Sequence, residues 1–181
     1  MRNFRPALVI CLLAVTIFTP TLARGRALPK RDHLTPQEAD LVRDAQLIDK
    51  RIDVFIRAAE RRFLVLQNPQ AVAPKQKDAE KWGELPKGTR AELLYDISKI
   101  LDEAITNIDD VSSREPKNPL LPKALRKLAE ACNRFLTQLT PLREQLKDER
   151  SDEREQLEQA IENAQEIIAA ADKLPPPPAK K

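Results

Sequence analysis

Few residues in this chain of 181 carry side chains that could act as metal ligands or redox groups. It holds one His, two Cys, one Met, one Trp and one Tyr. A zinc site needs three or four ligands, and His33 has no second histidine to join it. The C-x-x-C-H and Glu-x-x-His motifs of haem and di-iron proteins are absent as well. The sequence therefore predicts no metal and no cofactor.

Carboxylates and serines are more abundant, but their setting is not catalytic. General acid–base catalysis needs two acids in one cleft whose pKa values are pushed apart. Adjacent acids such as Asp102–Glu103 and Asp109–Asp110 instead fall on charged faces of predicted helices. The serines lack a glycine-rich elbow and a histidine partner on a helix. We therefore expect no catalytic residues and no enzyme activity.

Cys132 lies in a regular apolar seam of the segment 119–148. The seam follows the alternating spacing of four and three that marks a packed helix, with Leu128 and Phe135 on either side. A cysteine buried there packs as a small hydrophobe, and its thiol is inert. The alternative is a disulfide between two chains, because an odd cysteine in an exported protein permits one.

The N-terminus has the three parts of a secretory signal peptide. Arg2 and Arg5 precede an apolar run over 7–18, and Ala23 ends a site of small residues after Pro20. The apolar run is too short to cross a bilayer as a helix. We therefore predict a signal peptide over 1–23 and a protein that is periplasmic or extracellular. An uncleaved anchor is the alternative, because basic residues follow the run directly.

The segments outside the predicted domain suggest few partners. Removing Arg2 and Arg5 from 31 basic residues leaves 29 against 28 acidic ones, a net charge of about +1. That balance argues against nucleic acid, which calls for a basic face. The basic leader 24–34 is expected to be disordered, with at most a weak membrane contact. The proline-rich tail 174–181 is a spacer or a ligand for an aromatic groove.

Residues 35–173 are expected to fold as one all-α domain. Good helix formers dominate and no alternating β pattern occurs. Four amphipathic helices are predicted near 36–67, 89–112, 119–148 and 151–173, with a long loop over 68–88. Together they predict an antiparallel four-helix bundle. The alternative is a three-helix bundle with a long helical hairpin arm. Separately, residues 148–152 could be either a turn or part of one continuous helix.

Trp82 is the most suggestive residue outside the predicted seams. It lies in the loop 68–88, where a tryptophan can anchor a protein partner. It can equally cover one open end of the bundle. We treat Trp82 as a candidate partner contact, with the covering role as the favoured interpretation.

These observations favour a non-catalytic exported helical protein that acts as an interaction or scaffold module. Seams this regular can close within one chain or between chains, so self-association is compatible with them. A second hypothesis is a carrier of a small apolar ligand held within the bundle. Pro141 motivates it, because a proline inside a helix bends the axis and can open the packing.

Overall fold

The computed structural model describes residues 31–70, 76–146 and 151–176. These residues form α-helices joined by turns and extended connections, with no β-strand among them. The prediction of an all-α protein is therefore confirmed. The predicted signal peptide 1–23 lies outside the described residues. The helices are α1 (Pro36–Asp44), α2 (Ile48–Gln67), α3 (Gln76–Trp82), α4 (Arg90–Arg114), α5 (Leu121–Gln145) and α6 (Asp152–Asp172).

Helix starts follow the capping signals in the sequence. Thr35 and Thr89 each form a reciprocal capping box, with Glu38 and Glu92 respectively, at the starts of α1 and α4. Ser151 accepts a hydrogen bond from the backbone of Arg154 and caps α6. These three starts were predicted. α5 begins at Leu121, two residues after the predicted start, and Asn118 accepts a hydrogen bond from the backbone N–H of Leu120 in the preceding turn.

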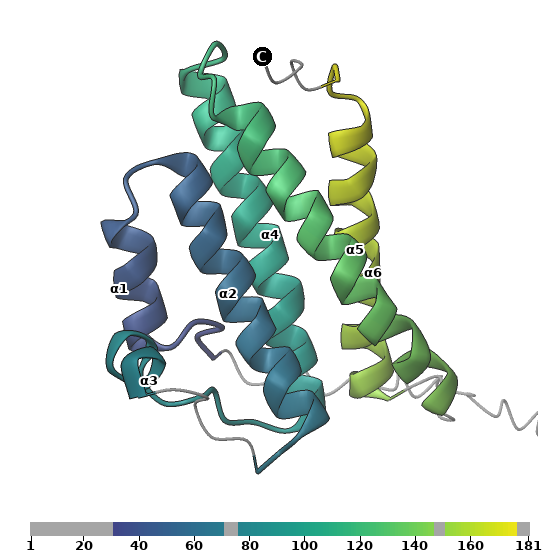
Figure 1. Cartoon of the computed structure of the whole chain (residues 1–181). Helices are drawn as coiled ribbons and strands as arrows, with labels where there is room; N and C mark the ends of the chain where they lie inside the picture. Colours follow the sequence, from purple (N-terminus) through teal and green to yellow (C-terminus); the bar gives the residue numbers. More distant parts are fainter. Residues whose placement is uncertain (1–30, 71–75, 147–150, 177–181) are drawn as a thin grey trace, which may run out of the picture.

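Four long helices share one apolar core (Figure 1). α4 and α5 lie in the middle, while α2 packs against both from one side and α6 from the other. Phe63 of α2 stacks on Phe135 of α5 with ring centres 4.9 Å apart. The fully buried side chains at the centre come from all four helices and include Ile52, Phe55, Ile97, Ile100, Leu128, Cys132, Leu157 and Ala164.

Consecutive long helices run in opposite directions, but not all packed pairs are antiparallel (Figure 1). α2 and α5 run the same way, since Asp53 pairs with Lys127 and Glu60 with Arg134. α4 and α6 are also parallel. The pairs α2–α4 and α5–α6 are antiparallel. Each long helix thus has a parallel and an antiparallel neighbour beside it, an arrangement that helix periodicity does not specify.

The predicted helix 36–67 is divided in two, which corrects the sequence prediction. The seam spacing continues through the break at residues 45–47, and this continuity suggested one helix. In a single helix Glu38 and Arg62 would lie about 36 Å apart at 1.5 Å per residue. Instead α1 folds back along α2, and the two side chains meet at 2.6 Å. The ion pair explains why the chain turns here.

The connections match the remaining boundaries within a few residues. The predicted loop 68–88 contains one short helix, α3. α5 includes Pro141 and ends at Gln145, and α6 begins at Asp152. Residues 148–150 of the segment 148–152 lie outside the described residues. The antiparallel packing of α5 on α6 nevertheless rules out one continuous helix. None of the described helices has the length and apolarity needed to span a membrane.

The shared core gives a direct stability prediction. Leu128→Ala removes a fully buried side chain and leaves a cavity, so we expect the free energy of unfolding to fall by about 2–5 kcal/mol. Urea unfolding followed by circular dichroism measures the change. Leu47→Ala is the matched control, because Leu47 is 55% exposed and its loss should cost under about 0.5 kcal/mol. Equal costs for both variants would contradict the assigned core.

Candidate functional site

A buried ionic cluster joins α1 to α2. The carboxylate of Glu38 accepts hydrogen bonds of 2.6 Å at both oxygens from Nη1 of Arg62. Its Oε1 also lies 3.0 Å from Nε of Arg61, an ion pair that is poorly directed for a hydrogen bond. All three side chains are buried. Buried charges are tolerated only when paired, so this carboxylate fixes the position of α1.

Asp96 extends the cluster to α4 and to the N-terminal segment. Its Oδ2 accepts a 2.9 Å hydrogen bond from Arg31 and lies 3.6 Å from Nε of Arg62. Its Oδ1 is buried and has no hydrogen-bond partner among the described residues. The cluster therefore leaves one carboxylate oxygen only partly compensated.

Burial dominates the protonation of Asp96. Removal from water raises its pKa to about 6, although the neighbouring charges of Arg62 and Arg31 act in the opposite direction. His33 also favours the ionised form, whereas Glu38 opposes it. A perturbed carboxyl can indicate a functional site, but structural ion networks produce the same shift.

His33 takes part in this network, although it belongs to the leader 24–34 that the sequence predicted to be disordered. Its Nε2 lies 2.6 Å from Oε2 of Glu103 on α4. Its backbone carbonyl accepts a 2.6 Å hydrogen bond from Arg62. Together with Arg31, it ties residues 31–34 of the predicted disordered leader to the domain. No local sequence pattern predicts these two contacts, which join residues 70 and 29 positions apart.

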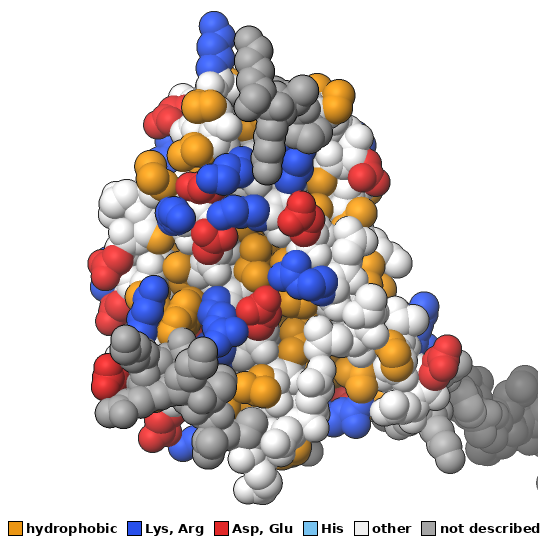
Figure 2. Space-filling view, viewed as in Figure 1, with side chains coloured by type: hydrophobic (Ala, Val, Ile, Leu, Met, Phe, Trp, Pro, Cys, Tyr) orange, Lys and Arg blue, Asp and Glu red, His pale blue; other side chains and the backbone are white. Residues whose placement is uncertain are grey.

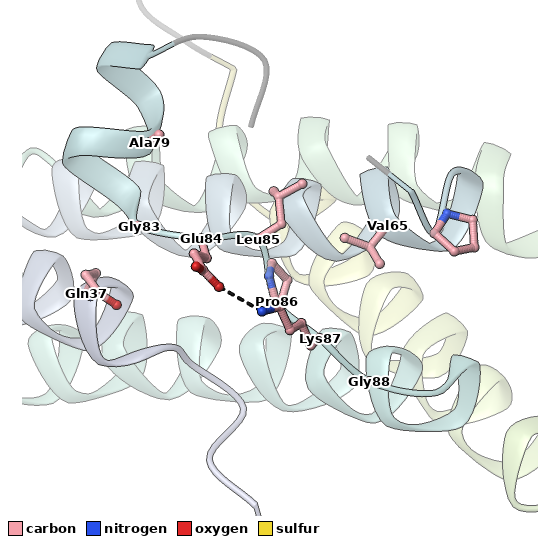
Figure 3. Close-up of a pocket in the computed structure, with 10 residues that line it drawn as sticks. Gln37, Val65, Ala79, Gly83, Glu84, Leu85, Pro86, Lys87 and Gly88 are labelled. Atoms are coloured by element: carbon pink, nitrogen blue, oxygen red, sulfur yellow. Dashed lines mark hydrogen bonds and ion pairs between the residues drawn. The ribbon is translucent and has the colours of Figure 1, made fainter. Parts of the chain in front are cut away.

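Two arginines of the cluster also hold the extended segment 83–88. Arg61 donates to the carbonyls of Gly83 and Glu84, and Arg31 donates to the carbonyl of Lys87 at 3.2 Å. This segment forms one wall of a pocket of about 790 Å³, which we call the loop pocket (Figure 3). Its other walls come from α1, α2 and α3, through Gln37, Val65, Pro69 and Ala79.

Trp82 ends α3 immediately before this segment and is buried. The guanidinium of Arg61 lies 5.8 Å from the centre of the Trp82 ring, and the ammonium of Lys81 lies 5.7 Å from it. Both distances are within the range of a cation–π contact. A tryptophan in this environment secures α3 against the cluster. The burial favours the covering role over a direct partner contact.

The other sequence candidates are distributed without forming a reactive centre. Cys132 is buried in the core as predicted, and burial raises the pKa of its thiol to about 12. Asp102 is exposed, and its neighbour Glu103 pairs with His33. Asp102 and Glu155 border a polar groove of about 330 Å³ between α4 and α6. Across the described residues, no group of three His, Cys, Asp or Glu could hold a metal ion.

A second set of ion pairs links α2 to α5. Asp49 is buried and accepts from Lys123 at 2.7 Å, while Lys127 donates to Asp53 at 2.7 Å. Figure 2 shows charges of both signs interspersed with hydrophobic side chains on the face that carries α2 and α5. These alternating charges fix the parallel register of the two helices and leave no large field of one sign on this face.

Comparison of the chain with known protein families, curated proteins and solved structures gives no match. The site must therefore be interpreted from its own geometry.

Sequence reasoning missed the ionic cluster, although one signal was present. Arg62 occupies a seam position where the pattern calls for an apolar residue, and Phe63 beside it packs in the core. A charge at such a position implies a buried acidic partner. The sequence does not identify this acidic partner, because Glu38 reaches Arg62 only through the fold-back of α1. Glu38 also forms the capping box with Thr35, which accounts for an acid at that position without a buried pair.

Asp96 should make stability depend on pH. Its pKa is raised in the folded protein, so its contribution is fully present below its unfolded pKa near 3.9 and is lost as the pH rises through about 6. The shift corresponds to about 3 kcal/mol. We expect the free energy of unfolding of Asp96→Asn, relative to the unaltered protein, to rise between pH 4 and pH 7, as measured by urea titrations.

Asp102→Asn is the matched control for this prediction, because Asp102 lies on the same helix and is exposed. Its stability relative to the unaltered protein should stay nearly constant over the same range. If the free energy of unfolding of Asp96→Asn, relative to the unaltered protein, fell as the pH rises, the ion pairs of Asp96 with Arg31 and Arg62 would outweigh the cost of its burial.

The thiol of Cys132 should be unreactive in the folded protein. Burial shields it and disfavours the thiolate, so a maleimide should label it only after unfolding in urea. The test uses the chain beginning at Arg24, which lacks Cys11. Ala169→Cys in a Cys132→Ala background is the control and should react rapidly, because Ala169 is exposed on α6. A disulfide-linked dimer abolished by Cys132→Ala would overturn this assignment.

Proposed function

We propose that this chain is an exported, non-catalytic protein whose four long helices form a four-helix bundle that serves as an interaction or scaffold module. The signal peptide over 1–23 would direct it to the periplasm or the extracellular space. The observation that carries the proposal is that the buried charges hold helices and segments together. Glu38, Arg61, Arg62 and Asp96 connect α1, α2, α4 and the 83–88 segment to one another.

The arrangement of the remaining acids supports a non-catalytic role. Among the described residues that line the loop pocket, Glu84 has the one carboxylate, and this group is exposed and paired with Lys87. The polar groove between α4 and α6 has two, but Asp102 and Glu155 are exposed to solvent. The described linings of these two hollows therefore supply no buried pair of acids with separated pKa values.

A second candidate function is the transport or storage of a small apolar ligand. The loop pocket favours it, because its volume lies within the range of about 300–1,000 Å³ typical of small-molecule sites. The pocket lies beside α2 and α3 and not at Pro141, where the sequence placed the opening. The core residue Leu139, two residues before that proline, is fully buried.

Export can be tested through the apolar run of the signal peptide. We expect the unaltered protein to leave the cytoplasm and to begin at Arg24, as shown by cell fractionation and mass spectrometry. Leu13→Arg should leave an uncleaved precursor in the cell, because a charge interrupts the apolar region that export requires. Leu47→Arg adds the same charge on an exposed position and should be exported normally.

The interaction role can be tested in the compartment where the protein resides. Lysine-directed crosslinking, followed by purification and mass spectrometry, should recover a defined partner or a second copy of the chain. Protein extracted under mild conditions should likewise sediment as a species heavier than the monomer. Recovery of a partner-free monomer under all conditions would remove the support for this proposal.

A further inference from the structure

We infer that the loop pocket binds an uncharged, mainly apolar small molecule that carries one hydrogen-bonding group. This inference rests on the second of the two proposed functions and is independent of the first. The apolar walls of the loop pocket, its paired charges and the side chain of Gln37 support it.

The walls of the loop pocket are mostly apolar. The hydrophobic lining comes from α2 and the turn after it, from α3 and from the extended segment, through Val65, Pro69, Ala79, Leu85 and Pro86 (Figure 3). Gly83 and Gly88 add backbone without side chains. A ligand in contact with these walls gains by removing apolar surface from water, at about 25 cal/mol per Å².

The backbone of the pocket is held in place by the protein itself. Gly83 has a φ of 68°, a conformation that glycine adopts without strain. A Cβ there would also lie 3.0 Å from the side chain of Gln37. Arg61 and Arg31 then hold the carbonyls on either side of Leu85. A wall fixed in this way need not be ordered by the ligand, so binding avoids that entropic cost.

The charges at the pocket select against a charged ligand. Among the described lining residues there is one acid and one base, Glu84 and Lys87, which pair with each other at 2.8 Å. Both side chains are 84% exposed, so they lie at the mouth and not against the apolar walls. A charged group placed deeper would lose its hydration without gaining a partner. The described lining is therefore neutral as a whole.

Gln37 supplies the polar contact. Its side-chain amide can both donate and accept hydrogen bonds. Within the described part of the chain it has no hydrogen-bond partner, and it borders the pocket beside Gly83. A neutral amine, alcohol or amide on the ligand would fit this group, while the rest of the ligand contacts the apolar walls.

Two related fluorescent probes test the site and the ligand class separately. N-phenyl-1-naphthylamine is uncharged, apolar and carries one N–H group, and its 8-sulfonate derivative differs by one negative charge. Titration into the purified protein should give saturable binding of the neutral probe and at least about tenfold weaker binding of the sulfonate. Energy transfer from Trp82, the sole tryptophan, reports whether the probe lies near the pocket.

Ala79→Phe fills the pocket from α3 and should weaken the neutral probe at least about tenfold. The control Ala169→Phe makes the same change at an exposed alanine of α6 and should leave the affinity unchanged. Gln37→Ala keeps the fold, because that side chain is exposed, and should weaken the probe roughly fivefold. Circular dichroism verifies that each variant remains helical.

The outcomes separate the ligand class from the function. If the sulfonate binds at the pocket as tightly as the neutral probe, the inference of an uncharged ligand is wrong while a carrier role remains supported. If neither probe binds, or if Ala79→Phe binds the neutral probe as well as the unaltered protein, both the assigned pocket and the carrier role are contradicted. The scaffold role does not depend on either result.

Discussion

The contact between Glu38 and Arg62 is the constraint on which the arrangement of the N-terminal third depends. Two charges buried together are stable only as a pair, because either one alone would be left without compensation in the interior. The pair forces α1 back along α2 and brings residues 31–34 over α4. Arg61 and Arg31 of the same cluster then hold the carbonyls of the 83–88 segment, so the loop pocket is a product of the cluster.

This cluster and the apolar core contribute to the fold in different ways. The core supplies most of the favourable free energy, but hydrophobic burial is not directional. Charged groups at fixed positions reject arrangements that leave them unpaired. The pairs of Asp49 and Asp53 with Lys123 and Lys127 act in the same way between α2 and α5, where register would otherwise depend on packing alone.

The helices and most of their starts could be predicted from the sequence, because capping boxes and apolar seams are local signals. Thr35, Thr89 and Ser151 mark starts that the structure confirms, and Cys132 lies in the core where its seam placed it. The break at 45–47 could not be predicted, since the seam continues through it. The candidate site was missed for a related reason. It joins residues from 31 to 96 whose proximity follows from tertiary packing and not from spacing.

The mixture of parallel and antiparallel neighbours has a consequence for how copies of this chain can meet. α2–α4 and α5–α6 are two antiparallel pairs, and within the folded domain the covalent link between them is the short segment 115–120. The surface that joins the two pairs is the same whether the second pair comes from the same chain or from another. Exchange of α5–α6 between two chains would therefore rebuild every contact of the core and give a dimer without a new interface.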